Sequence, residues 1–290
     1  MNGKELSMKS LVIFAVLVFV PASCALSHDT EDKQEIRKVL HFAGSQELRS
    51  ILVDNIRGSI NVSGYDGDSV ELVVHRTNFA DSEDKLAEAK EKVTLDIKEE
   101  KDRILLYVDA PWRNGDCIEY RGWHYHGYDV QMDFELRVPS RTSVYVKTVN
   151  DGDIKVEGME GAFEVQNVNG GVTMLNIIGA GKACTVNGSV EVVFSKKPEK
   201  DCKFRTVNGK VDVEFPADLS AVLDLKTMNG SVYTDFDVVG LPPKPALAES
   251  HGKRKVYLSD RSFAARVANG GPELSFETLN GNVHILKRQN

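Results

Sequence analysis

The 290-residue sequence is poor in the residues and motifs that mark several common functional classes. Lysine and arginine number 36 against 43 acidic residues, and this net charge of −7 argues against nucleic-acid binding, which requires a basic surface. Beyond the N-terminal segment, no stretch approaches the roughly 18 apolar residues of a membrane-spanning helix. Nucleophile-elbow, phosphate-loop and zinc-protease motifs are absent as well. These absences favour a protein that is not an enzyme and carries no cofactor.

Cysteine is scarce too, with four in the whole chain. Apart from Cys24 in the N-terminal segment, only Cys117, Cys184 and Cys202 remain, so at least one of these three is unpaired. Cys184 and Cys202 lie in successive units of a repeat, at different offsets from its motif. A disulfide between them and a pair of buried free thiols therefore both stay open.

Residues 1–27 predict a signal peptide. A basic start at Met8-Lys9-Ser10 precedes the apolar run Leu11–Val20, and the small residues of 21–27 suit a signal peptidase. The run is too short to cross a bilayer. Cys24 follows Ala22-Ser23 as in a lipoprotein signal, but Pro21 stands where a Leu-like residue is normal. We expect export to the periplasm or cell surface, with lipid attachment at Cys24 or its removal with the signal both open.

The chain is rich in regularly spaced Asn-Gly units, most of which begin with Thr and one further residue. Glycines 152, 170, 188, 209 and 230 end the first five units, so their spacings are 18, 18, 21 and 21 residues. Gly161 and Gly179 halve the first two intervals, and further units end at Gly270 and Gly281. A fixed period of this size is typical of stacked-repeat proteins, which usually serve as scaffolds or binding surfaces.

Each unit predicts a strand, a tight bend and a second strand. Segments such as Lys210–Phe215 alternate apolar and polar residues, as strands with one buried face do. Because Asn and Gly tolerate positive φ, we expect the Asn-Gly glycines to adopt it. The constant length favours an all-β, β-helix-like solenoid of 18–21-residue coils, with Asn side chains bonding along its axis. The alternative is an antiparallel β-meander or sandwich with Asn-Gly hairpins.

The rest of the chain divides around this repeat. After the signal, residues 28–44 are expected to form a leader, loose over 29–37, and a first strand. Residues 45–139 form a β-rich region with one helix near 81–92, capped by Ser82, and an aromatic insertion at 110–128. The repeat occupies 140–290 with an insertion at 240–256. We expect residues 282–288 to be a capping strand, because the last coil of a solenoid must be protected from edge-to-edge pairing with other chains.

These patterns resemble a bacterial family, the putative-adhesin domain of unknown function with β-strand repeats. The resemblance covers about residues 45–290 and rests on the serial Thr-Val-Asn-Gly units, Asp54-Asn55-Ile56-x-Gly58-Ser59-Ile60-x-Val62, Leu136-x-Val138-Pro139 and Thr278-Leu279-Asn280-Gly281-Asn282-Val283-x-Ile285. It implies an exported β-solenoid without established catalytic residues. The insertions at 110–128 and 240–256 lie outside the family pattern.

The aromatic insertion contains the candidate binding residues. Both tryptophans of the chain lie in it, and the residues selected are Trp112, Trp123, His124, Tyr125 and His126. Exposed aromatic side chains are good anchors for a protein or glycan. The His-x-His pair could instead hold Zn²⁺ or Cu²⁺ with Glu119 or Cys117, although two histidines alone seldom make a site. The third interpretation is an aromatic loop folded over the β-core.

The sequence therefore predicts an exported, non-enzymatic β-repeat protein of the cell envelope, structural or adhesin-like. Its expected partner is an envelope protein or a glycan, with membrane contact only through a lipid at Cys24. The alternative is a carbohydrate-active or metal-binding envelope protein that uses the 110–128 loop. A pair of carboxylates or a closed set of metal ligands near that loop would favour the alternative.

Overall fold

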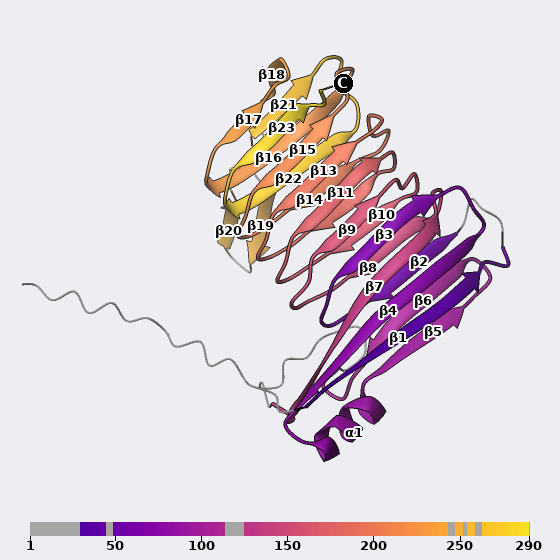
Figure 1. Cartoon of the computed structure of the whole chain (residues 1–290). Coiled ribbons are helices and arrows are strands. Elements are labelled where there is room, and N and C mark those ends of the chain that lie inside the picture. The colour runs from indigo at the N-terminus through magenta and orange to yellow at the C-terminus, as the bar shows by residue number, and fades with distance from the viewer. Residues whose placement is uncertain are drawn as a thin grey trace, which may run out of the picture.

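A computed structural model describes residues 30–44, 49–113, 125–242, 247–251, 254–258 and 263–289 of the protein. It confirms the all-β expectation, with 23 strands and one helix in the described ranges. Two mixed sheets, of ten and eleven strands, enclose one hydrophobic cluster in a layered, sandwich-like arrangement. In Figure 1 the chain runs from indigo strands at one end of the stack to yellow strands near the other.

The two sheets are mixed because long antiparallel strands flank a parallel centre. In spatial order, the ten-stranded sheet is β1 (Thr30–His41), β4 (Ser69–Ala80), β7 (Tyr128–Pro139), β3 (Ile60–Tyr65), β9 (Ile154–Glu157), β11 (Val172–Ile177), β13 (Val190–Phe194), β15 (Val211–Phe215), β23 (Val283–Lys287) and β17 (Val232–Thr234). The eleven-stranded sheet is β18 (Val238–Gly240), β21 (Phe263–Val267), β16 (Ala221–Asn229), β22 (Glu273–Asn280), β14 (Cys202–Arg205), β12 (Gly181–Cys184), β10 (Phe163–Gln166), β8 (Ser143–Lys147), β2 (Ser50–Asp54), β6 (Arg103–Asp109) and β5 (Thr94–Glu99). The insertion after Gly240 adds a separate hairpin of β19 (Leu247–His251) and β20 (Arg254–Leu258).

The predicted helix is present as α1 (Glu83–Lys92), between β4 and β5. Ser82 caps it as expected, its hydroxyl accepting a 3.3 Å hydrogen bond from the Lys85 amide. Acidic residues occupy the first turn and basic residues the last, which complements the helix dipole. Leu86 and Ala89 anchor the helix in the core. In the ranges that the structure describes, no helix is long and apolar enough to span a membrane.

Every Asn-Gly unit except Asn269-Gly270 joins a strand of one sheet to a strand of the other. The corner at Asn187-Gly188, for example, connects β12 in the eleven-stranded sheet to β13 in the ten-stranded sheet. Equivalent strands of successive units then pair in parallel and in register, as Val190 does with Val172 and Val211. The hairpin interpretation of these units is therefore wrong, because a hairpin would pair the two strands that flank each Asn-Gly.

The expectation of positive φ at the Asn-Gly glycines is mostly wrong. Of the seven Asn-Gly glycines, Gly209, Gly270 and Gly281 have it, at 156°, 80° and 158°, and glycines 152, 170, 188 and 230 do not. Gly270 lies between two strands of one sheet, so the other six are the corner glycines. The requirement for glycine arises instead from stacking. A Cβ on Gly188 would overlap the carbonyl oxygen of Gly170, and each of the other corner glycines meets the backbone of the adjacent corner in the same way. At these positions a residue with a side chain is excluded because its Cβ would overlap the backbone of the neighbouring coil, and not because of the backbone dihedral angle.

The other two motif positions make hydrogen bonds between coils. The threonine hydroxyl donates to the glycine carbonyl of the adjacent corner, as Thr185 does to Gly170 at 2.7 Å and Thr206 to Gly188 at 2.8 Å. The asparagine amides donate one to the next, as expected, at 2.7–2.8 Å. This asparagine ladder runs through Asn150, Asn169, Asn187, Asn208, Asn280 and Asn229.

The order of the coils in space differs from their order in the chain. The coil formed by β22 and β23 lies between those of β14/β15 and β16/β17. The capping role expected for residues 282–288 is therefore wrong: the short strands β17 and β18 end the stack. Similarly, β2/β3 lies between β6/β7 and β8/β9. The loose leader expected for 29–37 is also wrong from Thr30 onward, because β1 pairs along its whole length with β4.

Cys184 and Cys202 are free thiols. In register, Cys184 lies beside Arg205, three residues beyond Cys202 on β14, so the two sulfurs are not brought together. Burial raises the pKa of Cys202 to about 11 and also raises that of Cys184. Both thiols stay protonated near neutral pH, which makes them poor nucleophiles and metal ligands.

We predict that Gly188→Ala lowers the free energy of unfolding by about 1–3 kcal/mol, because the new methyl group meets the Gly170 carbonyl. Gly171→Ala is the matched control, since a Cβ there has only ordinary contacts of 3.5 Å or more. It should be neutral or up to about 1 kcal/mol stabilising. Urea denaturation of both variants checks this, and equal stabilities would contradict the stacking argument.

A second prediction concerns the asparagine ladder. Asn187→Ala removes two hydrogen bonds, to Asn169 and from Asn208, whereas Asn229→Ala at the end of the ladder removes one. Asn187→Ala should therefore be more destabilising by about 1 kcal/mol, the usual net contribution of one hydrogen bond. Thermal melts and urea denaturation measure the difference, and a larger loss for the end position would show that the ladder does not stabilise the stack.

Candidate functional site

The aromatic insertion occupies the place of a repeat corner. It connects β6 to β7, strands of opposite sheets that elsewhere in the stack are joined by an Asn-Gly bend. Residues 114–124 lie outside the described ranges, and with them Trp123, His124, Cys117 and Glu119. The predictions for those residues stay predictions. The two ends of the insertion are described, and they meet beside α1.

Three aromatic rings pack together where the two ends of the insertion meet. Trp112 stacks on His126, with ring centroids 5.3 Å apart and planes 15° apart. Tyr128, the first residue of β7, lies 6.1 Å from each of them. Tyr128 is buried and Trp112 is half-buried against the core, whereas Tyr125 and His126 are exposed. We call Trp112, Tyr125, His126 and Tyr128 the aromatic surface.

The aromatic surface is attached to the start of α1. The Tyr125 hydroxyl donates a 2.6 Å hydrogen bond to the Asp81 carboxylate, and the Asp81 amide donates to the Gly127 carbonyl at 3.0 Å. Gly127 has φ of 81°, a left-handed conformation that few other residues adopt. Partial burial and the bond to Asp81 raise the pKa of Tyr125 to about 12, so the phenol stays neutral and donating at physiological pH.

Arg113 fixes the other end of the insertion to the neighbouring coil. Its buried guanidinium donates to the Val108 carbonyl at 2.8 Å, forms an ion pair with Asp54 and lies 4.1 Å from the centre of the Tyr107 ring. Asp54 ends β2, the strand beside β6. No motif in the sequence points to Arg113, and its position next to Trp112 is the one available signal. A rigid base of this kind suits recognition, because few side chains have to be ordered on binding.

The structure brings together three of the five predicted binding residues, namely Trp112, Tyr125 and His126. Trp112 is half-buried and Tyr125 is 41% exposed, and their role in binding stays a prediction. Flat aromatic faces beside a hydroxyl and an imidazole can pack against the C–H face of a sugar or a protein side chain while donating hydrogen bonds. Across the described residues, no group of three or more His, Cys, Asp or Glu could hold a metal ion. The metal hypothesis involves His124, so it remains a prediction.

Comparison with known proteins gives only distant similarities. Neither a protein-family model nor a curated protein matches the chain. Similar solved structures include a putative cell adhesion protein from Clostridium sporogenes ATCC 15579, which is 11% identical, with 89% of this chain and 100% of that one covered and a TM-score of 0.45. A putative adhesin from Bacteroides fragilis NCTC 9343 is 8% identical, with 90% and 98% covered and a TM-score of 0.33. One from Parabacteroides distasonis ATCC 8503 is 10% identical, with 89% and 97% covered and a TM-score of 0.24.

These structural neighbours are thus putative adhesins or cell adhesion proteins, the kind of protein that the sequence resemblance implied. At such identities and TM-scores they carry no argument about what this chain binds. The function has to be argued from its own residues.

We predict that Trp112→Ala lowers the free energy of unfolding by about 2 kcal/mol, because it removes the stack on His126 and the contact with the core. Trp112→Phe keeps an aromatic ring and should recover most of that loss. Urea denaturation checks both variants. Unchanged stability in the alanine variant would mean that Trp112 does not hold the base of the insertion.

Proposed function

We propose that the protein is an exported, non-enzymatic interaction module of the cell envelope, which binds a protein or glycan partner through the aromatic surface. The observation that carries the proposal is the placement of that surface. Exposed His126 stacks on half-buried Trp112, and the exposed Tyr125 is held by its hydrogen bond to Asp81, in a coil where an insertion replaces the regular corner. An aromatic group that is exposed and also fixed loses little conformational freedom on binding.

We infer that the repeat is a two-sheet β-solenoid, the finer description of the all-β fold. Three features support this inference: successive strands alternate between the sheets, equivalent strands pair in parallel and in register, and the asparagine ladder links successive corners. A stack of this kind is stiff, because each coil is bonded along its length to its neighbours. A stiff scaffold suits an adhesin-like or structural role, in which the binding surface is held away from its attachment point.

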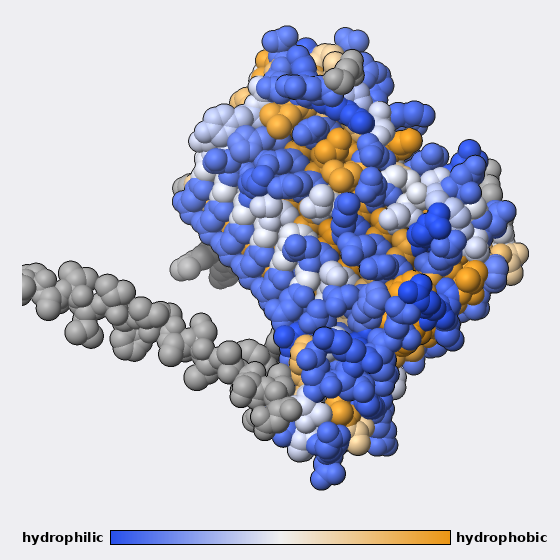
Figure 2. Space-filling view, viewed as in Figure 1, coloured by the Kyte–Doolittle hydropathy of each residue, from blue (hydrophilic) through white to orange (hydrophobic). Residues whose placement is uncertain are grey.

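Envelope placement is supported by the N-terminal sequence alone. The basic start at Met8, the apolar run to Val20 and the small residues after it precede the first described strand, and Cys24 offers a place for a lipid. The space-filling view agrees with a water-facing exterior, since hydrophilic residues cover most of the visible face and hydrophobic residues show in small groups (Figure 2).

The test compares two exposed tyrosines. Tyr125 on the aromatic surface is 41% exposed, and Tyr145 on β8, which lies between β10 and β2 in the eleven-stranded sheet, is 38% exposed. Tyr125→Ala should weaken binding of the purified protein to isolated cell-envelope material or to an arrayed glycan by about 2 kcal/mol, roughly thirtyfold. Tyr145→Ala should bind as the unchanged protein does. Binding curves measured by surface plasmon resonance give the ratio.

The same measurements distinguish an interaction surface from a merely structural loop. Melting temperatures close to that of the unchanged protein show that both variants remain folded. If the two variants bind equally well, the aromatic surface is not the contact, and the proposal fails. A Tyr125→Phe variant, which keeps the ring but loses the bond to Asp81, shows how much of the effect depends on fixing the ring.

A further inference from the structure

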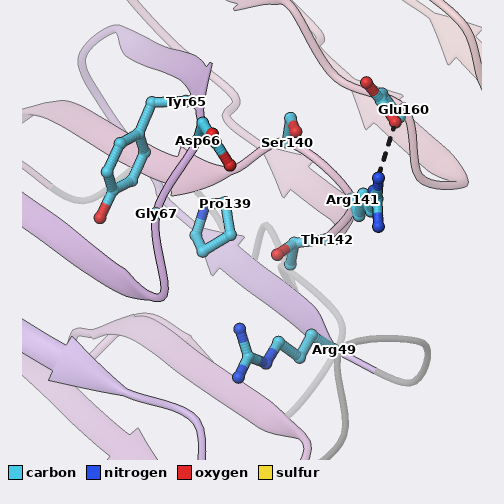
Figure 3. A pocket seen from close by; sticks show the side chains of 9 residues that line it. All are labelled: Arg49, Tyr65, Asp66, Gly67, Pro139, Ser140, Arg141, Thr142 and Glu160. Atoms are coloured by element: carbon cyan, nitrogen blue, oxygen red, sulfur yellow. Dashed lines mark ion pairs between the residues drawn. The ribbon is translucent and has the colours of Figure 1, made fainter.

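A polar cleft lies at the far end of β7 from the aromatic surface. Its volume is about 360 Å³, which is at the small end of the range for ligand pockets and large enough for one sugar residue. Residues from the turns after β3, β7 and β9 line it, together with Arg49 from the segment before β2 (Figure 3). The cleft has no signal in the sequence, because these turns share no motif.

Arg49 is the deepest charge in the cleft. Its side chain is 11% exposed, yet the one side-chain hydrogen bond that it makes to the described residues is a long 3.4 Å contact from Nη1 to Asp68. Its Nε has no partner. The guanidinium lies over Phe42, 5.3 Å from the ring centre, a contact that does not satisfy its N–H groups. A guanidinium has five N–H donors, and burying them with one weak acceptor is costly unless a ligand supplies more.

A second polar group in the same wall is unsatisfied. Thr142 is 1% exposed, and its hydroxyl makes no hydrogen bond. Its backbone amide donates a hydrogen bond to the Pro139 carbonyl, so only the side-chain hydroxyl lacks a hydrogen-bond partner. Buried hydroxyls almost always have a hydrogen-bond partner. A hydroxyl without one in the wall of a cleft could donate to an acceptor atom of a bound ligand after a small shift of the side chain.

The rim of the cleft carries the opposite charge. Asp66 and Glu160 are exposed there, and Arg141 neutralises Glu160 only weakly, at 3.7 Å. Carboxylates accept hydrogen bonds from hydroxyl groups and repel a ligand with several negative charges. Tyr65 and Pro139 add apolar surface, and the Tyr65 ring is fixed by its hydroxyl bond to the Ser69 carbonyl at 2.7 Å and by Arg137 over its face.

We propose that this cleft binds an acidic sugar, with the single carboxylate of the sugar at Arg49 and Thr142 and its hydroxyl groups at Asp66 and Glu160. One buried cation matches one carboxylate, and the acidic rim matches a polyol. The site is separate from the aromatic surface, because Tyr128 begins β7 and Pro139 ends it. A strand of that length spans roughly 35–40 Å. Failure of the cleft proposal would therefore leave the proposed function standing.

The experiment titrates the purified protein with four probes: glucuronate, glucose, acetate and inorganic phosphate. Calorimetry should give saturable binding of glucuronate at least tenfold tighter than that of the other three. Binding of glucose as tight as that of glucuronate would overturn the role of Arg49. Phosphate or acetate binding as tightly as glucuronate would show a simple anion site and overturn the sugar assignment. No binding of glucuronate would overturn the proposal altogether.

Variants test the individual contacts. Arg49→Gln should weaken glucuronate binding at least tenfold, and Arg205→Gln, an exposed arginine on β14, should leave it unchanged. Should Arg49→Gln fail to fold, Thr142→Val serves instead, because it removes an unpartnered hydroxyl and replaces it with a methyl group. It should lower glucuronate affinity severalfold with a melting temperature equal to or above that of the unchanged protein. Unchanged affinity in the folded variant overturns the proposal.

Discussion

The close contact between successive corners is the constraint on which the rest of this structure depends. Each corner glycine lies against the glycine carbonyl of the adjacent corner, so closely that a methyl group at Gly188 would not fit. The same carbonyl accepts the threonine hydroxyl, as at Thr185 and Gly170. The spacing between coils, the register of the strands and the asparagine ladder all follow from this contact. The corner aligns each strand with its neighbours along the strand direction.

Both candidate surfaces lie where the regular corners are interrupted. The aromatic surface occupies the coil in which residues 110–127 replace an Asn-Gly bend, and the cleft lies among turns at the opposite edge of the stack, next to Pro139. In the regular coils the inward side chains form the core, and the Thr and Asn side chains of the corners are engaged in hydrogen bonds between coils. The irregular segments between the strands are where binding groups can accumulate.

Local signals in the sequence predicted local structure well. The period at Asn187-Gly188, the alternation after it and the cap at Ser82 each depend on a few neighbouring residues, and the strands and the helix follow from them. The order of the coils could not be predicted, because the Thr278–Gly281 unit looks like every other unit and its partners are set by packing. The glycine requirement and the cleft around Arg49 and Thr142 were missed for the same reason, since each arises from residues distant in the chain.

The insertion of β22/β23 between β14/β15 and β16/β17 has a consequence for how the chain assembles. A simple linear repeat can add coils in the order of synthesis, each on the one before. Here the coils β14/β15 and β16/β17 cannot close against each other until residues 273–287 have entered between them. Completion of the fold thus depends on contacts between residues more than one repeat apart in the chain, which slows folding. Strand edges stay unpaired until the last coil enters. A chain kept extended until its C-terminal coil is available, as translocated chains are, would avoid that exposure.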